Sequence, residues 1–285
     1  MKDKIYYYDR NGTLQLTLNE YPYYSEPRDL FDWTWGFNEQ FGRINTFRRS
    51  KGTYELLIGI AGEYAHRHNA LCDIFNADVL ANEPGYLLIN GWKLPCYITE
   101  ADNSIVFDMN RQTKFIVRAI NSTWIRENTK SYNGAPGGGS LGDDLGRDYT
   151  YEDGLMGRGY NYGYSQPESH YASIDLAGTN NGFEAVIYGP QVNPVIYLNN
   201  QPVQVNVELT ATQRLRIVSN GSIKTIEILE ANGTSTDAFV YRDKENTPFL
   251  TLGQHTDLTF GQVRFDFTTI ERRSQPTWNC LLYTS

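Results

Sequence analysis

Two histidines and a cysteine lie within ten residues of this sequence, in the segment HRHNALCDIF at 66–75. Imidazole nitrogens and thiolate sulfurs are ligands that zinc prefers, and a tetrahedral site needs three or four ligands. On a helix, His68 and Cys72 would be four residues apart and share a face, which supplies half of a zinc site. The remaining cysteines and histidines are scattered singly, at Cys96, Cys280, His170 and His255. Because partner ligands are missing, the sequence favours packing over metal binding.

The element that must position these residues is a predicted helix over 62–82. Apolar side chains recur at helical spacing in this segment and form a stripe along one side of the helix. They are Tyr64, Ala65, Leu71, Cys72, Phe75 and Val79. The Pro-Gly pair at 84–85 ends the periodic segment. Cys72 lies on this stripe, where a free cysteine behaves as a small hydrophobic residue, and His68 borders it. We therefore predict that His66, His68 and Cys72 bind no metal.

Most of the chain is predicted to be β-structure. Aromatic residues make up 14% of it, with 21 tyrosines, and its 25 glycines add to a composition that favours strands and tight turns. Asn-Gly pairs suit the type I′ turns of hairpins, and three of them separate convincing strands. Two hairpins are GYLLINGWKLPCYITEA at 85–101 and RLRIVSNGSIKTIEIL at 214–229, and KTIEILEANGTSTDAFVY at 224–241 continues the second as a meander. The predicted fold class is mainly β, with two β-sandwich-like domains.

A long stretch between residues 128 and 170 divides the chain. It is rich in glycine, tyrosine and aspartate and has no hydrophobic periodicity, as is typical of a loop or linker. The sequence therefore predicts a Gly/Tyr-rich linker at 131–168. This linker would join an N-terminal domain, 1–130, to a C-terminal domain, 169–285.

The composition of the predicted linker changes along its length. Glycines concentrate in 134–148 and predict a flexible tether, whereas the tyrosines of 149–164 could dock on a neighbour. The carboxylates that could bind calcium are Asp143, Asp144, Asp148, Glu152 and Asp153. Their spacing does not fit an EF-hand loop, so a solvated acidic loop is the favoured interpretation.

Composition and motifs exclude several functions. The net charge of −8 gives no electrostatic basis for binding nucleic acid. No run of about 18 apolar residues predicts membrane insertion, and the N-terminal segment MKDKIYYYDRNG does not resemble a signal peptide. The sequence has no GxSxG motif, and GAPGGGS lacks the lysine of a phosphate-binding loop. We therefore expect a protein that is not an enzyme, with no catalytic residues and no cofactor.

Large aromatic side chains are the remaining candidates for a functional surface. The segment FDWTWGFNEQFGRINTFRRS carries Trp33, Trp35 and Phe37, while Trp92 and Trp124 lie in other predicted strands. Such side chains can stack on sugars, but packing in a core or at a protein interface is their more common role. We take these five residues as interface candidates, and the whole composition indicates an interaction or assembly protein.

Two series of segments follow one another in a distinctive order. In the N-terminal part, the aromatic segment precedes TYELLIGIAG, the helix, the hairpin PGYLLINGWKLPCYITEA and a strand that runs into AINSTW. The C-terminal part contains AVIYGPQVNPVIYLNN, ELTATQRLRIVS, IKTIEILEANG and FLTLGQHTDLTF. This order, with an A-x-x-x-x-W motif at Ala119–Trp124, resembles the distal tail protein family, the Dit-like proteins of long-tailed bacteriophages. The resemblance covers nearly the whole chain outside 128–170.

The resemblance implies both an architecture and an assembly. It implies an N-terminal β-sandwich with a single helix and a β-hairpin, followed by a galectin-like β-sandwich. The family forms a homo-hexameric ring at the tail tip, between the tail tube protein and the tail-associated hub or lysin protein, and can hold receptor-binding proteins. The protein would then belong to the virion, in the phage tail tip, and would be assembled in the bacterial host cytoplasm.

A second class of function stays open on the sequence alone. A carbohydrate-binding β-sandwich module or adhesin would be a monomer with an aromatic groove, whereas a tail protein would form a ring-sized species. The C-terminal part lacks the galectin run of His, Asn, Arg, Trp and Glu on adjacent strands, so the resemblance does not imply lectin activity.

Overall fold

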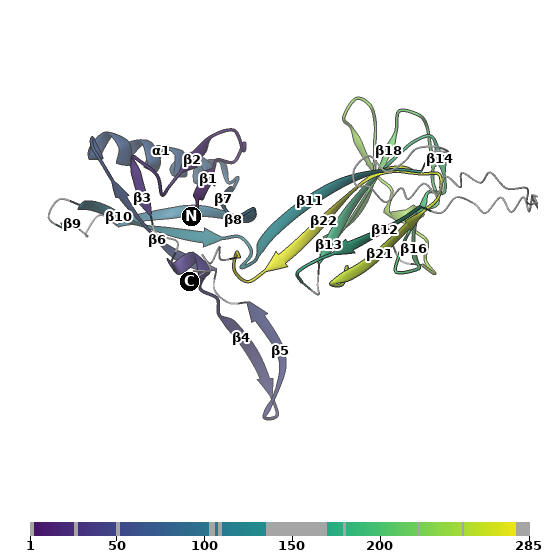
Figure 1. Ribbon diagram of the computed structural model, residues 1–285, viewed down its shortest axis with the longest axis horizontal. Helices are drawn as coiled ribbons and strands as arrows, with labels where there is room; N and C mark the ends of the chain where they lie inside the picture. The colour runs from purple at the N-terminus through teal and green to yellow at the C-terminus, as the bar shows by residue number, and fades with distance from the viewer. Residues whose placement is uncertain are drawn as a thin grey trace, which may run out of the picture. The chain divides into compact units, whose positions relative to one another are not determined.

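The computed structural model describes residues 3–25, 28–49, 52–102, 106–107, 110–134, 170–178, 181–221, 223–246 and 248–277. The chain is mainly β, which confirms the predicted fold class (Figure 1). Its described residues divide into two compact units. The first unit contains the residues up to Arg126 together with those from Arg272 onward, and the second contains Glu127–Glu271.

In its described part, the first unit contains one α-helix. Most of its strands lie before residue 120. Its elements are β1 (Ile5–Tyr8), β2 (Gln15–Thr17), β3 (Tyr23–Ser25), η1 (Arg28–Phe31), β4 (Trp35–Gln40), β5 (Arg43–Arg49), β6 (Thr53–Ile60), α1 (Tyr64–Ala81), β7 (Gly85–Ile89), β8 (Trp92–Asp102), β9 (Val106–Phe107) and β10 (Asn110–Ala119). Strand β11 (Trp124–Asn133) begins in this unit and continues into the second one.

The second unit is built from strands and one short 3₁₀ helix in its described part. Its elements are β12 (His170–Asp175), β13 (Gly182–Tyr188), β14 (Gln191–Val192), β15 (Val195–Leu198), β16 (Gln201–Gln204), β17 (Glu208–Leu209), β18 (Arg214–Asn220), β19 (Ile223–Leu229), β20 (Ser235–Asp237), η2 (Phe239–Tyr241), β21 (His255–Phe260) and β22 (Arg264–Arg273). Strand β22 ends in the first unit, so the chain passes between the units along β11 and again along β22.

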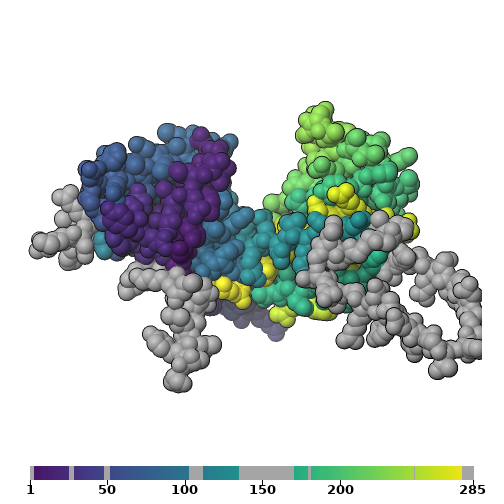
Figure 2. Space-filling view, turned by 45° about the horizontal axis from the view of Figure 1, so that its top comes forward, coloured from purple at the N-terminus to yellow at the C-terminus, as the bar shows by residue number. Residues whose placement is uncertain are grey.

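An antiparallel path of strands, β2-β1-β7-β8-β10-β6-β3, forms the framework of the first unit. Buried positions alternate along β1, β7 and β8, which is the pattern of a sheet with one face in a core. Helix α1 contributes Leu71 and Phe75 to this core. Phe75 makes edge-to-face contacts with Tyr7 and Phe115, with ring centroids 4.9 and 5.4 Å away. Figure 2 shows the N-terminal residues, in purple, packed against later residues of the unit, in blue.

The helix and the first hairpin confirm two predictions from the sequence. Helix α1 ends at Ala81, and Asn82 follows in the left-handed conformation with φ of 56°, where its backbone N–H caps the helix. In the turn between β7 and β8, Asn90 and Gly91 have φ of 51° and 80°. Two positive φ angles are what a type I′ hairpin turn requires, so the Asn-Gly pair fixes the register of β7 on β8.

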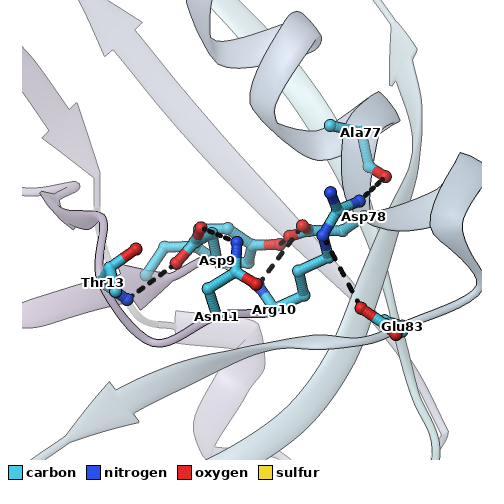
Figure 3. A network of polar contacts seen from close by, with 8 residues as sticks. Asp9, Arg10, Asn11, Thr13, Ala77, Asp78 and Glu83 are labelled. Atoms are coloured by element: carbon cyan, nitrogen blue, oxygen red, sulfur yellow. Dashed lines mark hydrogen bonds and ion pairs between the residues drawn. The ribbon is translucent and has the colours of Figure 1, made fainter.

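A buried carboxylate joins the end of α1 to the first strand. The Tyr7 hydroxyl donates a hydrogen bond of 2.6 Å to Asp78 Oδ2, and the backbone N–H of Arg10 donates to Asp78 Oδ1 at 3.3 Å. Figure 3 shows Arg10 reaching from the turn after β1 to Ala77 and Glu83, through a hydrogen bond of 2.8 Å and an ion pair of 3.7 Å. Burial and the bond to Asp78 raise the pKa of the Tyr7 hydroxyl. The network holds α1 against the sheet.

The second unit is a β-sandwich. One sheet has the strand order β12-β21-β15-β16, and the other contains β11-β22-β13-β18-β19-β20. The core takes alternate residues of both sheets, as two packed sheets require. From the first sheet come Ile174, Ile196, Leu198, Val203, Leu258 and Phe260, and from the second Phe183, Ile187, Leu215, Ile217, Phe265 and Phe267.

The boundaries differ from those expected at 131–168. Strand β11 extends to Asn133, and Gly134 donates its backbone N–H to the carbonyl oxygen of Val263 at 3.0 Å. His170 pairs with Phe260 in the register of β12 and β21. Both ends of the Gly/Tyr-rich stretch therefore lie in the second unit, next to residues 260–263. Residues 135–169, on which the tether and calcium predictions fall, are outside the described residues.

This arrangement predicts that a cut in the Gly/Tyr-rich stretch leaves the protein in one piece. A specific protease site inserted between Gly138 and Gly139 would produce two fragments, and each fragment contributes residues to both units. β11 would stay beside β22, where Ser131 bonds to Asp266 at 2.6 Å. We expect both fragments in one peak of native size exclusion and two bands on a denaturing gel. Separation of the fragments without denaturant would contradict the assignment of β11 to the second unit.

Candidate functional site

Strands β4 and β5 form a two-stranded antiparallel sheet of their own in the first unit. Figure 1 shows them as a separate ribbon. Phe41 and Gly42 connect them with φ of 55° and 71°, so a phenylalanine takes the turn position that asparagine fills in the β7–β8 hairpin. A two-stranded hairpin is marginally stable by itself in water, so its stability depends on what covers it.

Large apolar side chains of this segment face solvent. The exposed fractions are 54% for Trp33, 40% for Trp35, 56% for Phe37, 95% for Phe41, 51% for Ile44 and 62% for Phe47. Phe37 and Phe47 are directly opposite each other in the register, so they share one face of the hairpin. None of the six belongs to the hydrophobic core of the first unit or to the partly buried residues packed against it. We call these six residues the aromatic face; large apolar residues left exposed together on one short segment are typical of interaction sites.

The five interface candidates from the sequence fall into two groups. Trp33, Trp35 and Phe37 belong to the aromatic face. Trp92 and Trp124 are fully buried in the core of the first unit, which corrects their choice as interface candidates. The Trp92 ring is also covered by the guanidinium groups of Arg126, at 4.8 Å, and Arg273, at 5.5 Å.

Sequence reasoning missed three members of the aromatic face: Phe41, Ile44 and Phe47. The turn between β4 and β5 is Phe-Gly, whereas the usual sequence signal of such a turn is Asn-Gly. The available signal was the glycine at 42 with a large apolar residue on each side of it, Phe37 and Phe47, in the segment GFNEQFGRINTF. A second signal was present in WKLPCYI, where Trp92, Leu94 and Cys96 are every second residue. They therefore share one face of the strand, which is the core face.

The histidine and cysteine of α1 lie together, as their spacing predicts, in a packed environment. The His68 ring stacks near Tyr64 and Phe115, with centroid distances of 5.5 and 6.1 Å. Cys72 Sγ lies 3.8 Å from the ring nitrogens of His68. Burial, and then the charge of Asp73, raises the pKa of the Cys72 thiol and disfavours the thiolate that zinc needs.

The described residues offer little support for other chemistry. Among them, no group of three or more His, Cys, Asp or Glu side chains is arranged to hold a metal ion. No helix in the described part of the chain is long and apolar enough to cross a membrane. The aromatic face is therefore the strongest candidate for a functional site, and what it can do is bind another protein surface.

Comparison with known proteins gives fold likeness without close sequence likeness. No family model matches the sequence, and no curated protein matches it. A chain of the phage P2 baseplate in its activated conformation with calcium is similar, with a TM-score of 0.57, 12% identity, and coverage of 97% of this chain and 100% of that one. The P2 baseplate with strontium gives a TM-score of 0.56 at 11% identity, with coverage of 97% and 100%.

A third similar structure comes from another phage. The Dit protein (gp 19.1) of SPP1, described as a paradigm of the hub adsorption apparatus in phages that infect Gram-positive hosts, has a TM-score of 0.55 and 10% identity. It is matched over 96% of this chain and 100% of its own. The chain thus has the fold of a phage baseplate protein. Within that class, its fold is that of the Dit-like distal tail proteins.

Proposed function

We propose that this chain is a structural, non-enzymatic protein of a phage tail tip, where copies of it form a closed ring. The observation that carries the proposal is the aromatic face of the β4–β5 hairpin on a chain with a Dit-like fold. Covering this face with a second copy removes apolar surface from water, at about 25 cal/mol per Å². Aromatic residues are enriched in the buried centres of such interfaces.

A hairpin that docks on a different surface of the next copy makes a head-to-tail contact. Such contacts close into rings when the rotation between neighbours allows it. The number six comes from the resemblance to the Dit family. The first unit would make the ring contacts, and the galectin-like description of the second unit stays a prediction.

The remaining partners also follow from the family. The ring would join the tail tube protein to the tail-associated hub or lysin protein, and the second units would be able to hold receptor-binding proteins. The protein would be located in the virion and assembled in the bacterial host cytoplasm. The baseplate and hub origin of the similar structures supports this placement in the tail.

Size exclusion with light scattering tests the proposal on the purified full-length chain. We expect a species of about six times the chain mass of 32.6 kDa. A carbohydrate-binding module or adhesin with no structural role would instead elute as a monomer. A monomer at all concentrations up to the solubility limit would contradict ring formation.

A further inference from the structure

The sheet β12-β21-β15-β16 of the second unit has one face in the core and one face in solvent. Burial alternates along β12, β15 and β21, so every second side chain of these strands points outward. Those with functional groups are Tyr171, Ser173, Asp175, Tyr197, His255, Asp257 and Thr259. We call this surface the tyrosine face, because two exposed tyrosines lie on it.

The two tyrosines form one row across the sheet. Tyr171 on β12 is opposite Thr259 on β21, and Thr259 is opposite Tyr197 on β15. Two strand spacings place the tyrosines about 10 Å apart on the same face. Their exposed fractions are 57% and 38%, so both rings are accessible. This separation suits two sugar rings of one extended glycan chain, each with its apolar C–H face against a tyrosine.

Hydrogen bonds position one of the rings. The Tyr171 hydroxyl donates to Asp257 Oδ1 at 2.5 Å, and Asp257 lies in the neighbouring row of the face. This bond holds the Tyr171 ring along the sheet surface. The backbone N–H of Asp257 donates to the side chain of Asn199 at 2.8 Å, which fixes the end of β15 beside it. A fixed ring loses less conformational entropy when a ligand stacks on it.

The charged groups beside the rings are also organised. His255 Nδ1 lies 2.8 Å from Asp175 Oδ1, and His255 Nε2 lies 3.2 Å from Asp257 Oδ1. The hydrogen bond to Asp175, and then the charge of Asp257, raises the pKa of His255 above its usual value. Within the described residues, the Oδ2 atom of each carboxylate accepts no hydrogen bond, so both remain able to accept hydroxyl groups.

The arrangement is suited to binding and not to cleavage by a serine nucleophile. Ser173 Oγ is 3.5 Å from His255 Nδ1, the nitrogen that Asp175 already engages. A Ser-His-Asp triad needs the serine and the aspartate on opposite nitrogens of the imidazole. Two carboxylates beside one imidazole leave the face negative whether or not the imidazole is protonated, which disfavours anionic ligands.

We propose that the tyrosine face binds a neutral polysaccharide. Sugar rings stack on Tyr171 and Tyr197, and sugar hydroxyls donate hydrogen bonds to the free oxygens of Asp175 and Asp257. The proposal goes beyond the structural role in the tail tip and does not depend on ring formation.

Affinity electrophoresis of the full-length chain tests it, in gels that each contain dextran, mannan, galactan or a β-1,3-glucan, with hyaluronate as the anionic comparison. At least one neutral polysaccharide should retard the protein. Tyr171→Ala and Tyr197→Ala should each weaken this binding by about tenfold or more. Tyr171→Phe keeps the ring and should retain most of the affinity.

Tyr241→Ala provides a matched control, because Tyr241 is 51% exposed in the same unit and lies outside the face. It should leave retardation unchanged, and circular dichroism should show all variants folded. The proposal would be overturned if no neutral polysaccharide retarded the protein, or if hyaluronate alone did. It would also be overturned if the wild type and both alanine variants were retarded equally. A further contradicting result is that the wild type binds no polysaccharide while the alanine variants have a lower oligomeric mass. The face would then contact a second copy of the chain.

Discussion

Replacing Phe37 and Phe47 together by aspartate should convert the assembled protein into monomers. The two side chains are opposite each other on the β4–β5 hairpin and are 56% and 62% exposed in the single chain. Burying a phenylalanine contributes about 1.5–3 kcal/mol, so losing two per contact weakens association more than about a hundredfold. The new carboxylates would also have to be buried without partners. Light scattering should give a mass near 32.6 kDa for this variant.

The same hairpin supplies the matched control. Asn38 and Thr46 are the next pair in the register, so their side chains point to the other face. Asn38→Asp with Thr46→Asp adds two carboxylates to the same strands and should leave the oligomeric mass unchanged. If the Phe37/Phe47 variant kept the wild-type mass, or if both variants lost it equally, the aromatic face would not be the ring contact.

Gly85→Ala should lower the free energy of unfolding of the first unit by about 2–4 kcal/mol. Gly85 begins β7, and a Cβ there would overlap the Tyr7 hydroxyl and lie 2.6 Å from the carbonyl oxygen of Tyr8. Moving Tyr7 to relieve the overlap breaks its hydrogen bond to buried Asp78, which would lose a donor in the core. Overpacking and an unsatisfied carboxylate therefore act together.

Urea unfolding followed by tryptophan fluorescence measures this effect, because no tryptophan lies between residues 127 and 271. Gly59→Ala is the control: it lies in β6 of the same unit, and its Cβ would meet nothing closer than the Tyr24 carbonyl oxygen at 3.4 Å. It should change stability by less than about 0.5 kcal/mol. If both variants lost the same free energy of unfolding, close approach to Tyr7 would not be the reason that residue 85 is a glycine.

Elements with strong local signals could be predicted from the sequence. The helix has an apolar stripe and a Pro-Gly end, and the β7–β8 hairpin has an Asn-Gly turn whose two residues adopt positive φ. The aromatic segment at 33–37 stands out in the sequence, and Trp33, Trp35 and Phe37 are exposed in the structure; their role at an interface stays a prediction. The facing half of the hairpin was missed because Phe41 occupies a left-handed position that rarely accepts a large side chain.

Long-range pairing could not be predicted in this way. The boundaries of the second unit depend on β11 lying beside β22 and on β12 pairing with β21. Local composition suggested a division inside the Gly/Tyr-rich stretch, while these pairings keep both of its ends in the second unit. The tyrosine face also depends on long-range pairing. Tyr171 and Tyr197 lie on either side of Thr259 in the sheet, and Thr259 is distant from both in the sequence.

Electron microscopy of the purified full-length protein tests the central proposal most directly. Class averages of negatively stained particles should show closed rings with six repeated subunits, formed without any other tail protein. The Phe37/Phe47 aspartate variant should give no rings on the same grids. Fields of single chains for the wild-type protein, or open filaments in place of closed rings, would contradict the account.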